Sequence, residues 1–176
     1  MELELIPARP EHADSFLRWR AQAATLRHNP LRAVTRAEVE RQLLDEGAAL
    51  TELGRRDAFR WFVRLGEALV GNVSMRVNTL MGFAEIAYGV DEAFHGRGIG
   101  TAAVRLLVDK AFSETTLRRL VAFVHDENLP SLKLLDRLGF AREGVLREHY
   151  VIRGQPANEV VFGLLRREWQ ARRAGP

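Results

Sequence analysis

Hydrophobic and polar residues alternate in some segments of the chain and recur at helical spacing in others. Alternation places side chains on the two faces of a strand, whereas apolar residues three and four positions apart form one face of a helix. Alternating or short apolar runs predict strands at residues 2–6, 58–65, 68–77, 83–90, 119–124, 140–152 and 157–165. Helical spacing predicts helices from Pro10 to Asn29, from Thr35 to about Gly47, around Val104 to Phe112, and from Asn128 to Gly139.

Turn and capping residues support several of these boundaries. Thr35-Arg36-Ala37-Glu38 is a capping box, in which Thr35 and Glu38 satisfy backbone N–H groups at the start of a helix. Gly66-Glu67 predicts a hairpin turn between two of the strands. Asn128 is a good N-cap, and Gly139 a good stop, for the helix between them. The charged tail, residues 166–176, is predicted to be helical at first and frayed at its end.

These elements predict one α/β domain over residues 1–176. The chain has 176 residues, of which 47% are hydrophobic and 28% charged, which is typical of a single soluble domain. Its apolar runs are shorter than the roughly 18 residues that a membrane span needs, and residues 1–5 lack a signal pattern. We therefore expect a cytoplasmic protein, monomeric or homodimeric, that does not associate with membranes.

The composition excludes several kinds of chemistry. There is no cysteine, which excludes disulfides, thiolate metal sites and an acyl group carried on a cysteine. The five histidines form no HExxH or similar pair, and so we expect no metal. The net charge is only +3, and 24 of the 26 basic residues are arginines scattered among acids. This pattern predicts an arginine-rich surface rather than a nucleic-acid groove.

A glycine-rich loop, residues 95–101 (His-Gly-Arg-Gly-Ile-Gly-Thr), lies between a predicted strand and a predicted helix. Glycines at alternate positions allow an anion to approach the backbone closely. The helix that follows points its free N–H groups and the positive end of its dipole toward the same place. Arg97 adds a positive charge between two glycines. The loop therefore predicts a site for the pyrophosphate of a larger ligand.

The same loop has two other interpretations. Gly98-x-Gly100-x-x-Ala103 matches the looser form of the dinucleotide fingerprint. That fingerprint should follow its strand in a tight turn and precede an acidic residue by about 20 positions. Here residues 91–97 separate the strand from Gly98, and Arg118 stands at the acidic position. A purely structural glycine turn is the other alternative.

Three blocks of sequence point to one family when they are taken with the order of the predicted elements. The blocks are Val90-Asp91-Glu92-x-Phe94-His95-Gly96-Arg97-Gly98-Ile99-Gly100-Thr101, Asn128-x-x-Ser131-x-x-Leu134-Leu135-Asp136-Arg137-Leu138-Gly139-Phe140, and residues 144–169 with Arg147-Glu148-His149-Tyr150 and Asn158-Glu159-Val160. The first resembles the acetyl-CoA motif, Q/R-x-x-G-x-G/A, of the GCN5-related N-acetyltransferase (GNAT) family, and the second its next block. The third is similar to the branch of ribosomal-protein N-terminal alanine and serine acetyltransferases. The resemblance covers essentially the whole chain.

The resemblance implies the GNAT fold, a central mixed and mostly antiparallel sheet with helices on both faces, and acetyl-CoA as cosubstrate. It implies that the backbone of Tyr88, Gly89 and Val90 contacts the pantetheine arm, which adds itself like an extra strand. It also implies that Asn128, besides capping its helix, bonds the pantetheine. The loop residues that it assigns to the cofactor are His95, Gly96, Arg97, Gly98, Ile99, Gly100 and Thr101.

Three positions depart from the family pattern. His95 replaces the usual Gln or Arg, which puts one side-chain contact in doubt but not the backbone cradle. Asn158 stands where an aspartate is common. Leu135 stands where many members of the superfamily have the tyrosine that protonates the leaving thiolate, and so that role is missing at its commonest position.

Acetyl transfer to an amine needs a base for the amine proton and a proton donor for the departing thiolate. Glu85 is the candidate base, because an apolar setting beside Phe83 and Ala87 would help it to take up a proton. Similar enzymes use a glutamate from this strand, although Glu85 could instead pair with an arginine. Ser131 is the candidate proton donor by resemblance, and its alternative role is close packing in a first helical turn.

The acceptor site is expected where the first two helices meet the final hairpin, near Trp19, residues 28–32 and Tyr150. Tyr150 and His149 could donate a proton or contact the acceptor, or serve as packing residues at its rim. The resemblance implies an N-acetyltransferase that acts by direct transfer to a primary amine, such as a protein N-terminal α-amine. The alternatives are an acetyltransferase of small-molecule or antibiotic amines and an acyl-CoA-binding module whose catalysis has lapsed.

Overall fold

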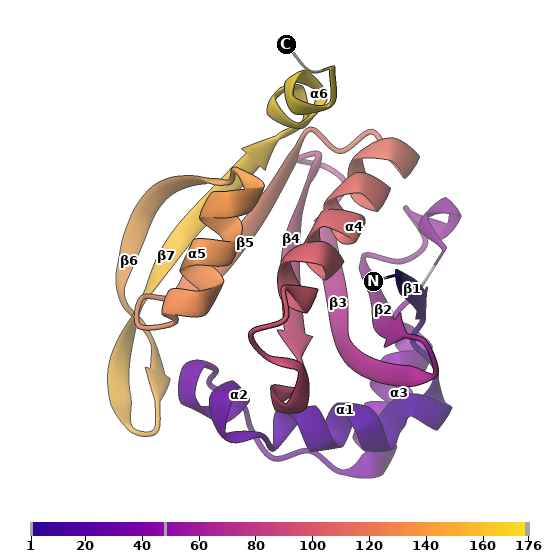
Figure 1. Cartoon of the computed structure of the whole chain (residues 1–176), viewed down its shortest axis with the longest axis vertical. Coiled ribbons are helices and arrows are strands. Elements are labelled where there is room, and N and C mark those ends of the chain that lie inside the picture. Colours follow the sequence, from indigo (N-terminus) through magenta and orange to yellow (C-terminus); the bar gives the residue numbers. More distant parts are fainter. Residues whose placement is uncertain (1, 48, 175–176) are drawn as a thin grey trace.

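The computed structural model describes residues 2–47 and 49–174 and contains a seven-stranded sheet. The strand order is β1-β2-β3-β4-β5-β7-β6, as Figure 1 shows. Neighbouring strands are antiparallel except for β4 and β5, which are parallel. The strands are β1 (Leu3–Pro7), β2 (Ala58–Leu65), β3 (Ala68–Asn78), β4 (Phe83–Val90), β5 (Arg119–His125), β6 (Ala141–Ile152) and β7 (Gln155–Leu165). The mixed, mostly antiparallel sheet predicted from the sequence is confirmed.

Helices connect the strands and cover both faces of the sheet. The long helix α4 links β4 to β5, as a parallel pair requires, and α5 lies beside α4 on the same face (Figure 1). The helices are α1 (Ala13–Arg20), α2 (Ala23–His28), α3 (Arg36–Asp45), α4 (Ile99–Glu114), α5 (Leu129–Leu138) and α6 (Arg166–Ala174). Short 3-10 turns occur at Pro10–His12, Leu50–Glu52 and Glu92–Phe94.

Two hydrophobic cores lie on opposite faces of the sheet. The larger core packs α4 and α5 against strand residues such as Trp61 and Ile86. The smaller core packs α1 and α3 against Phe62, which is fully buried. Trp61 and Phe62 are neighbours on β2 and therefore point to opposite faces. Burial on both faces fixes the register of the sheet, and with it the position of the loop that follows β4.

Most predicted boundaries agree with the structure, but the single helix predicted from Pro10 to Asn29 is wrong. The segment forms a 3-10 turn, α1 and α2, and Gln22 between the helices is extended, with φ −67° and ψ 146°. The side chain of Gln22 bonds Asp91, and the Glu92 N–H donates to Gln22 Oε1. These tertiary bonds favour the break, which helical periodicity could not reveal.

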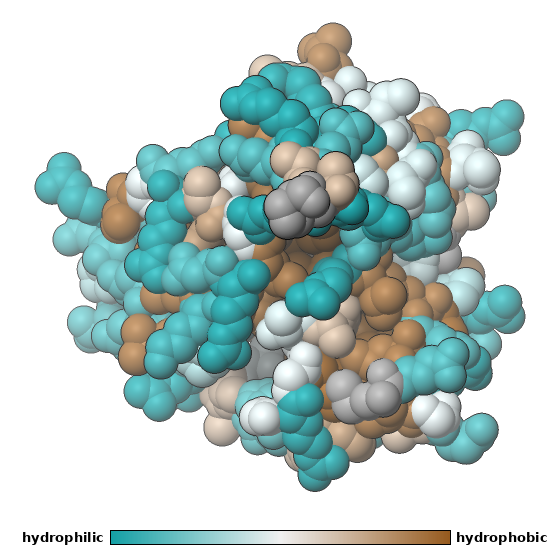
Figure 2. Space-filling view, turned by 45° about the horizontal axis from the view of Figure 1, so that its top comes forward, coloured by the Kyte–Doolittle hydropathy of each residue, from teal (hydrophilic) through white to brown (hydrophobic). Residues whose placement is uncertain are grey.

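The tail is helical through Ala174, and the end predicted to fray, residues 175–176, lies outside the described residues. Trp169 ties α6 to α4, because its Nε1 donates to Asp109 Oδ1 over 2.7 Å. No helix in the described part of the chain is long and apolar enough to cross a membrane. Figure 2 shows hydrophilic side chains over much of the side formed by β6 and α5, although Val145 and Val151 are exposed on β6.

Candidate active site

Strands β4 and β5 are paired over only three residues and then separate. The pairs are Phe83 with Arg119, Ala84 with Leu120, and Glu85 with Val121. Beyond Glu85, β4 stays paired with β3 on its other side as far as Val90. The divergence of the two strands toward the glycine loop is visible in Figure 1. One edge of β4, from Ile86 to Val90, is therefore unpaired on the side of β5.

A close approach between β3 and β4 accompanies this separation. A Cβ atom placed on Gly71 of β3 would lie 2.3 Å from the carbonyl oxygen of Gly89. Only glycine leaves room for the β4 backbone at this point. The end of β4 therefore lies tightly against β3, on the side away from β5.

The glycine loop has the geometry expected for an anion cradle. Gly96 and Gly98 have φ values of +75° and +76°, a region that favours glycine, and the space beside both is open. Gly98 precedes α4 without a side-chain cap, so the first N–H groups of this 16-residue helix are available to a ligand. Gly100 faces α5, and a Cβ atom there would lie 3.0 Å from Leu134.

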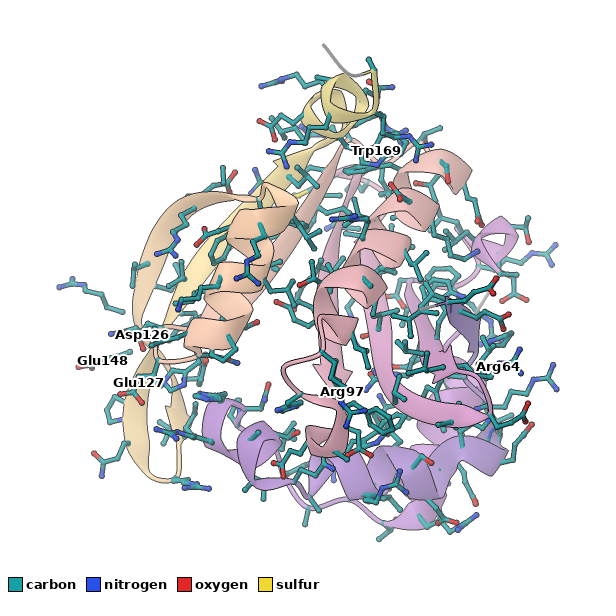
Figure 3. The ribbon with its side chains drawn as sticks, in the orientation of Figure 1. Arg64, Arg97, Asp126, Glu127, Glu148 and Trp169 are labelled. Atoms are coloured by element: carbon teal, nitrogen blue, oxygen red, sulfur yellow. The ribbon has the colours of Figure 1, made fainter. Side chains whose placement is uncertain are left out.

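Arg97 and His95 of the loop occupy different positions. Arg97 is exposed at the start of α4, and its guanidinium lies 5.3 Å from the centre of the Phe94 ring (Figure 3). His95 is turned back onto the strand, with Nε2 2.9 Å from the carbonyl oxygen of Val90. A carbonyl oxygen can only accept, so this nitrogen carries a proton and donates. His95 therefore helps to fix the start of the loop.

Asp91, between β4 and the loop, is a site residue to which the sequence analysis gave no role. Its carboxylate accepts hydrogen bonds from Gln22, Trp19, Arg18 and the backbone N–H of Ala93, over 2.8 to 3.4 Å. Burial of Asp91 opposes the charged form, but these hydrogen bonds outweigh it and hold the pKa of the carboxyl below its ordinary value. Asp91 thus connects α1 to the start of the glycine loop.

Asn128 and Ser131 lie together at the start of α5. Asn128 caps the helix, since its Oδ1 accepts from the backbone N–H of Ser131 over 3.3 Å. The Ser131 hydroxyl lies 2.6 Å from the hydroxyl of Tyr88. The family resemblance implies only backbone contacts for Tyr88, and so this side-chain contact was not predicted. It joins α5 to the unpaired part of β4.

Glu85 occupies the face predicted for it, but the apolar setting expected there is wrong. Ala84 and Ile86 on either side of it are buried beneath α4, whereas Glu85 and Ala87 are exposed on the opposite face. Glu85 stands beside Val121 at the last pair before β4 and β5 separate. Its carboxylate is therefore accessible to solvent, next to the last pair between β4 and β5.

Aromatic and histidine side chains gather where α2 meets the hairpin of β6 and β7. The rings of His28 and His125 have their Nδ1 atoms 3.0 Å apart, and the Tyr150 ring centre lies 6.3 Å from that of His125. His149 bonds Glu159 and lies 6.2 Å from Tyr150, centre to centre. Burial, and then the negative charge of Glu159, raises the pKa of the Tyr150 hydroxyl. We call these five residues the hairpin cluster.

The structure brings together only part of the predicted acceptor region. His28 and Tyr150 both adjoin His125, which the sequence analysis did not select. Trp19 is buried in the smaller core, and its indole is bonded to Asp91, so it braces the site instead of lining it. Arg32 turns away to form an ion pair with Glu38 at the start of α3.

Asn158 has a definite role at a bulge in β6. Its Oδ1 accepts from the backbone N–H of Glu148, and its Nδ2 donates to Asp126 Oδ2, both over 2.9 Å. Figure 3 shows Asp126 and Glu127 beside Glu148 at this point. An amide can accept and donate at once, whereas an aspartate here would face the Asp126 carboxylate without a proton to share. Asparagine at position 158 therefore fits these partners better than the aspartate that is common in the family.

Comparison with known proteins identifies the family. Residues 2–141 match the family described as the acetyltransferase (GNAT) domain. The chain belongs to the GNAT acetyltransferase family. It is 35% identical over 130 residues to the probable N-acetyltransferase YjcK of Bacillus subtilis, covering 73% of this chain and 72% of that one. As a member of this family, the protein is an acetyltransferase, and neither the dinucleotide nor the purely structural interpretation of the glycine loop is needed.

Solved structures with this fold come from enzymes with different acceptors. RimL, described as a ribosomal L7/L12 α-N-protein acetyltransferase in complex with coenzyme A, aligns with a TM-score of 0.82 at 18% identity, covering 93% of each chain. A SpeG spermidine N-acetyltransferase chimera from Vibrio cholerae and a human enzyme aligns with a TM-score of 0.84 at 19% identity, covering 97% of this chain and 99% of that one. At these identities the likeness shows the fold of the GNAT family.

Proposed function

We propose that this member of the GNAT family transfers the acetyl group of acetyl-CoA directly to a primary amine, the α-amine of a protein N-terminus. The observation that carries the proposal is the unpaired edge of β4, which leads to an open glycine cradle at an uncapped helix. An extended chain ending in a diphosphate fits this combination better than a compact ligand does.

The residues present suit acetyl-CoA at both ends of this path. The backbone of Tyr88, Gly89 and Val90 would bond the amide groups of the pantetheine arm, as a further strand would. The N–H groups of residues 96–101 would hold the pyrophosphate, with the dipole of α4 and the charge of Arg97 adding attraction. Asn128 caps α5 through Oδ1, which leaves its Nδ2 to donate to the pantetheine.

Acetyl-CoA supplies an acetyl group already activated as a thioester. In the proposed reaction the neutral amine nitrogen attacks the thioester carbon, the C–S bond breaks, and its electron pair goes to sulfur. Before the attack Glu85 takes a proton from the ammonium form of the amine, directly or through water, and returns it to solvent. After the attack the nitrogen loses its second proton to water. Ser131 donates a hydrogen bond to the sulfur as charge develops, and the thiolate takes its proton from solvent.

The acceptor would reach the thioester across the face of the sheet that carries Glu85, past the hairpin cluster. The sequence blocks shared with the ribosomal-protein branch and the fold shared with RimL support a protein N-terminus. The fold shared with the SpeG chimera supports a small polyamine as the second candidate.

The test mixes purified protein with acetyl-CoA and a panel of acceptors while free thiol is measured. The panel holds peptides that begin with Ala or Ser, the same peptides with blocked N-termini, and spermidine. Thiol release with free but not blocked peptides, with the acetyl group located on the α-amine by mass spectrometry, would support the proposal. Release with spermidine alone would support the second candidate. Calorimetric binding of NADP but not of acetyl-CoA would overturn both.

A further inference from the structure

The hydroxyl groups of Tyr88 and Ser131 meet between β4 and α5, and no other residue of these two elements carries a hydroxyl group. Their oxygens are 2.6 Å apart, a short hydrogen bond between residues 43 positions apart in sequence. Leu135 lies one turn further along α5, where it is fully buried and has no acidic proton to donate.

Ser131 is held in place from two directions. Its backbone N–H donates to Asn128 Oδ1, and its hydroxyl meets Tyr88. Tyr88 in turn is fixed, because its strand is paired with β3 through Gly89 and Val90 and its ring packs against the larger core. Neither hydroxyl belongs to a mobile surface side chain, and so their relative position is well defined.

The chemistry of the two groups decides which one donates. A phenol is a much stronger acid than an aliphatic alcohol and is therefore the better hydrogen-bond donor. Burial raises the pKa of Tyr88 to about 12, although the bond with Ser131 acts in the opposite direction, and so Tyr88 is protonated at neutral pH. When Tyr88 donates, the Ser131 oxygen is the acceptor and its own proton must point elsewhere.

Ser131 lies beside the path assigned to the pantetheine arm. Ser131 stands at the first turn of α5, beside Asn128, and Tyr88 lies on the unpaired part of β4. The start of α4 is close by, since a Cβ atom on Gly100 would touch Leu134 of α5. The two hydroxyls thus stand where the cofactor chain would leave the glycine loop and enter between β4 and β5.

We propose that Tyr88 is a positioning residue, whose hydroxyl donates to Ser131 Oγ and thereby directs the Ser131 proton at the sulfur of bound coenzyme A. This inference rests on the proposed function. No proton leaves Tyr88 in the reaction. Ser131 stabilises the negative sulfur as the C–S bond breaks, and Tyr88 polarises the Ser131 hydroxyl, which makes it a stronger donor. The phenol thus acts through the serine and does not touch the sulfur.

The test measures the pKa of the thiol of coenzyme A bound to the protein, and so it needs no acceptor. The ultraviolet absorbance of the thiolate is followed as pH rises, with the complex of desulfo-coenzyme A as the blank. A donor at the sulfur stabilises the thiolate, so the wild-type protein should hold the thiol pKa below that of free coenzyme A. Ser131→Ala should raise it by about one unit, a tenfold change, and Tyr88→Phe by about half as much.

The double variant separates positioning from direct contact. If Tyr88 acts through Ser131, adding Tyr88→Phe to Ser131→Ala should change the thiol pKa no further. In steady-state kinetics, Tyr88→Phe should lower kcat several-fold, with the KM for acetyl-CoA changed less than twofold. Ser113→Ala removes an exposed hydroxyl at the far end of α4 and should leave the bound thiol pKa unchanged.

Each other result overturns the inference in a recognisable way. If the Tyr88→Phe protein has a lower melting temperature but the same bound thiol pKa as the wild type, the hydrogen bond is purely structural. An equal effect of Tyr88→Phe with and without Ser131 would mean that the phenol contacts the sulfur itself. Failure of the wild-type protein to bind coenzyme A at all would overturn the proposed function, and the inference with it.

Discussion

The indole Nε1 of Trp19 donates a hydrogen bond to Oδ2 of Asp91 over 3.0 Å, and the two residues lie 72 positions apart in the chain. This bond attaches α1 to the segment that leads into the glycine loop. Gln22 and Arg18 bind the same carboxylate, so that three side chains from α1 and its end converge on it. The loop that would hold the pyrophosphate is therefore fixed from outside the β4–α4 unit.

Asp91→Asn should destabilise the protein at neutral pH, because an amide cannot accept from all four donors. We expect a loss of about 2 kcal/mol in the free energy of unfolding, measured by urea unfolding at pH 7. The folded-state pKa of Asp91 is lowered, so its contribution is present above its unfolded value of about 3.9 and is lost as pH falls through the folded value. The difference between variant and wild type should thus shrink near pH 3.

The matched control for this experiment is Asp45→Asn at the exposed end of α3, which should have a negligible effect at both pH values. An equal loss at pH 7 and pH 3 would show that the carboxylate charge is not what stabilises the contact.

Stability should also depend on pH through His28. Burial, then the neighbouring His125 and Arg27, lowers its pKa, while Glu127 acts in the opposite direction. A lowered histidine pKa means that the unfolded chain binds the proton more readily, so stability should fall as pH drops below about 6.5, by at most about 1.4 kcal/mol per pH unit. The measurement is thermal or urea unfolding between pH 7.5 and pH 5, taken as about the range in which histidine titrates.

His28→Gln should flatten this pH dependence, because it removes the titrating group. Leu26→Ala, an exposed change on the same helix, leaves the His28–His125 contact in place and should keep the wild-type slope. Identical slopes in all three proteins would contradict a role for His28.

Gly98→Ala should weaken binding of coenzyme A by about fivefold, since the cradle requires a positive φ that an alanine adopts at a cost of about 1 kcal/mol. Gly66→Ala in the β2–β3 turn is the control, because Gly66 also has a positive φ and open space beside it. Both variants should lose similar stability, but only Gly98→Ala should lose affinity in calorimetry. Equal affinities would remove the loop from the cofactor site.

Glu85→Gln should lower kcat by roughly 10²-fold, the contribution typical of a general base, with little change in the affinity for acetyl-CoA. The loss should diminish as pH rises, because more of the acceptor amine is then already neutral. Glu4→Gln, an exposed strand glutamate on β1, is the control and should leave kcat unchanged. A wild-type kcat for Glu85→Gln at every pH would assign the proton transfer to another group, with the hairpin cluster as the next candidate.

The local pattern of residues was enough to predict the strands, the capping box and the glycine loop. The Thr35 hydroxyl and the Glu38 carboxylate form the predicted reciprocal hydrogen bonds, and Gly98 and Gly139 both have the left-handed backbone that suits them. These features depend on residues a few positions apart, so that periodicity and backbone preference specify them directly.

Other features depend on contacts between distant segments, and the sequence could not supply them. The break between α1 and α2 follows bonds to Asp91 and Glu92, and the meeting of Tyr88 with Ser131 requires the packing of α5 over β4. Alternation predicted correctly that Glu85 faces away from Ile86, but not that its face is open to solvent. A sequence determines which side of a strand a residue occupies, whereas the tertiary structure decides what, if anything, covers that side.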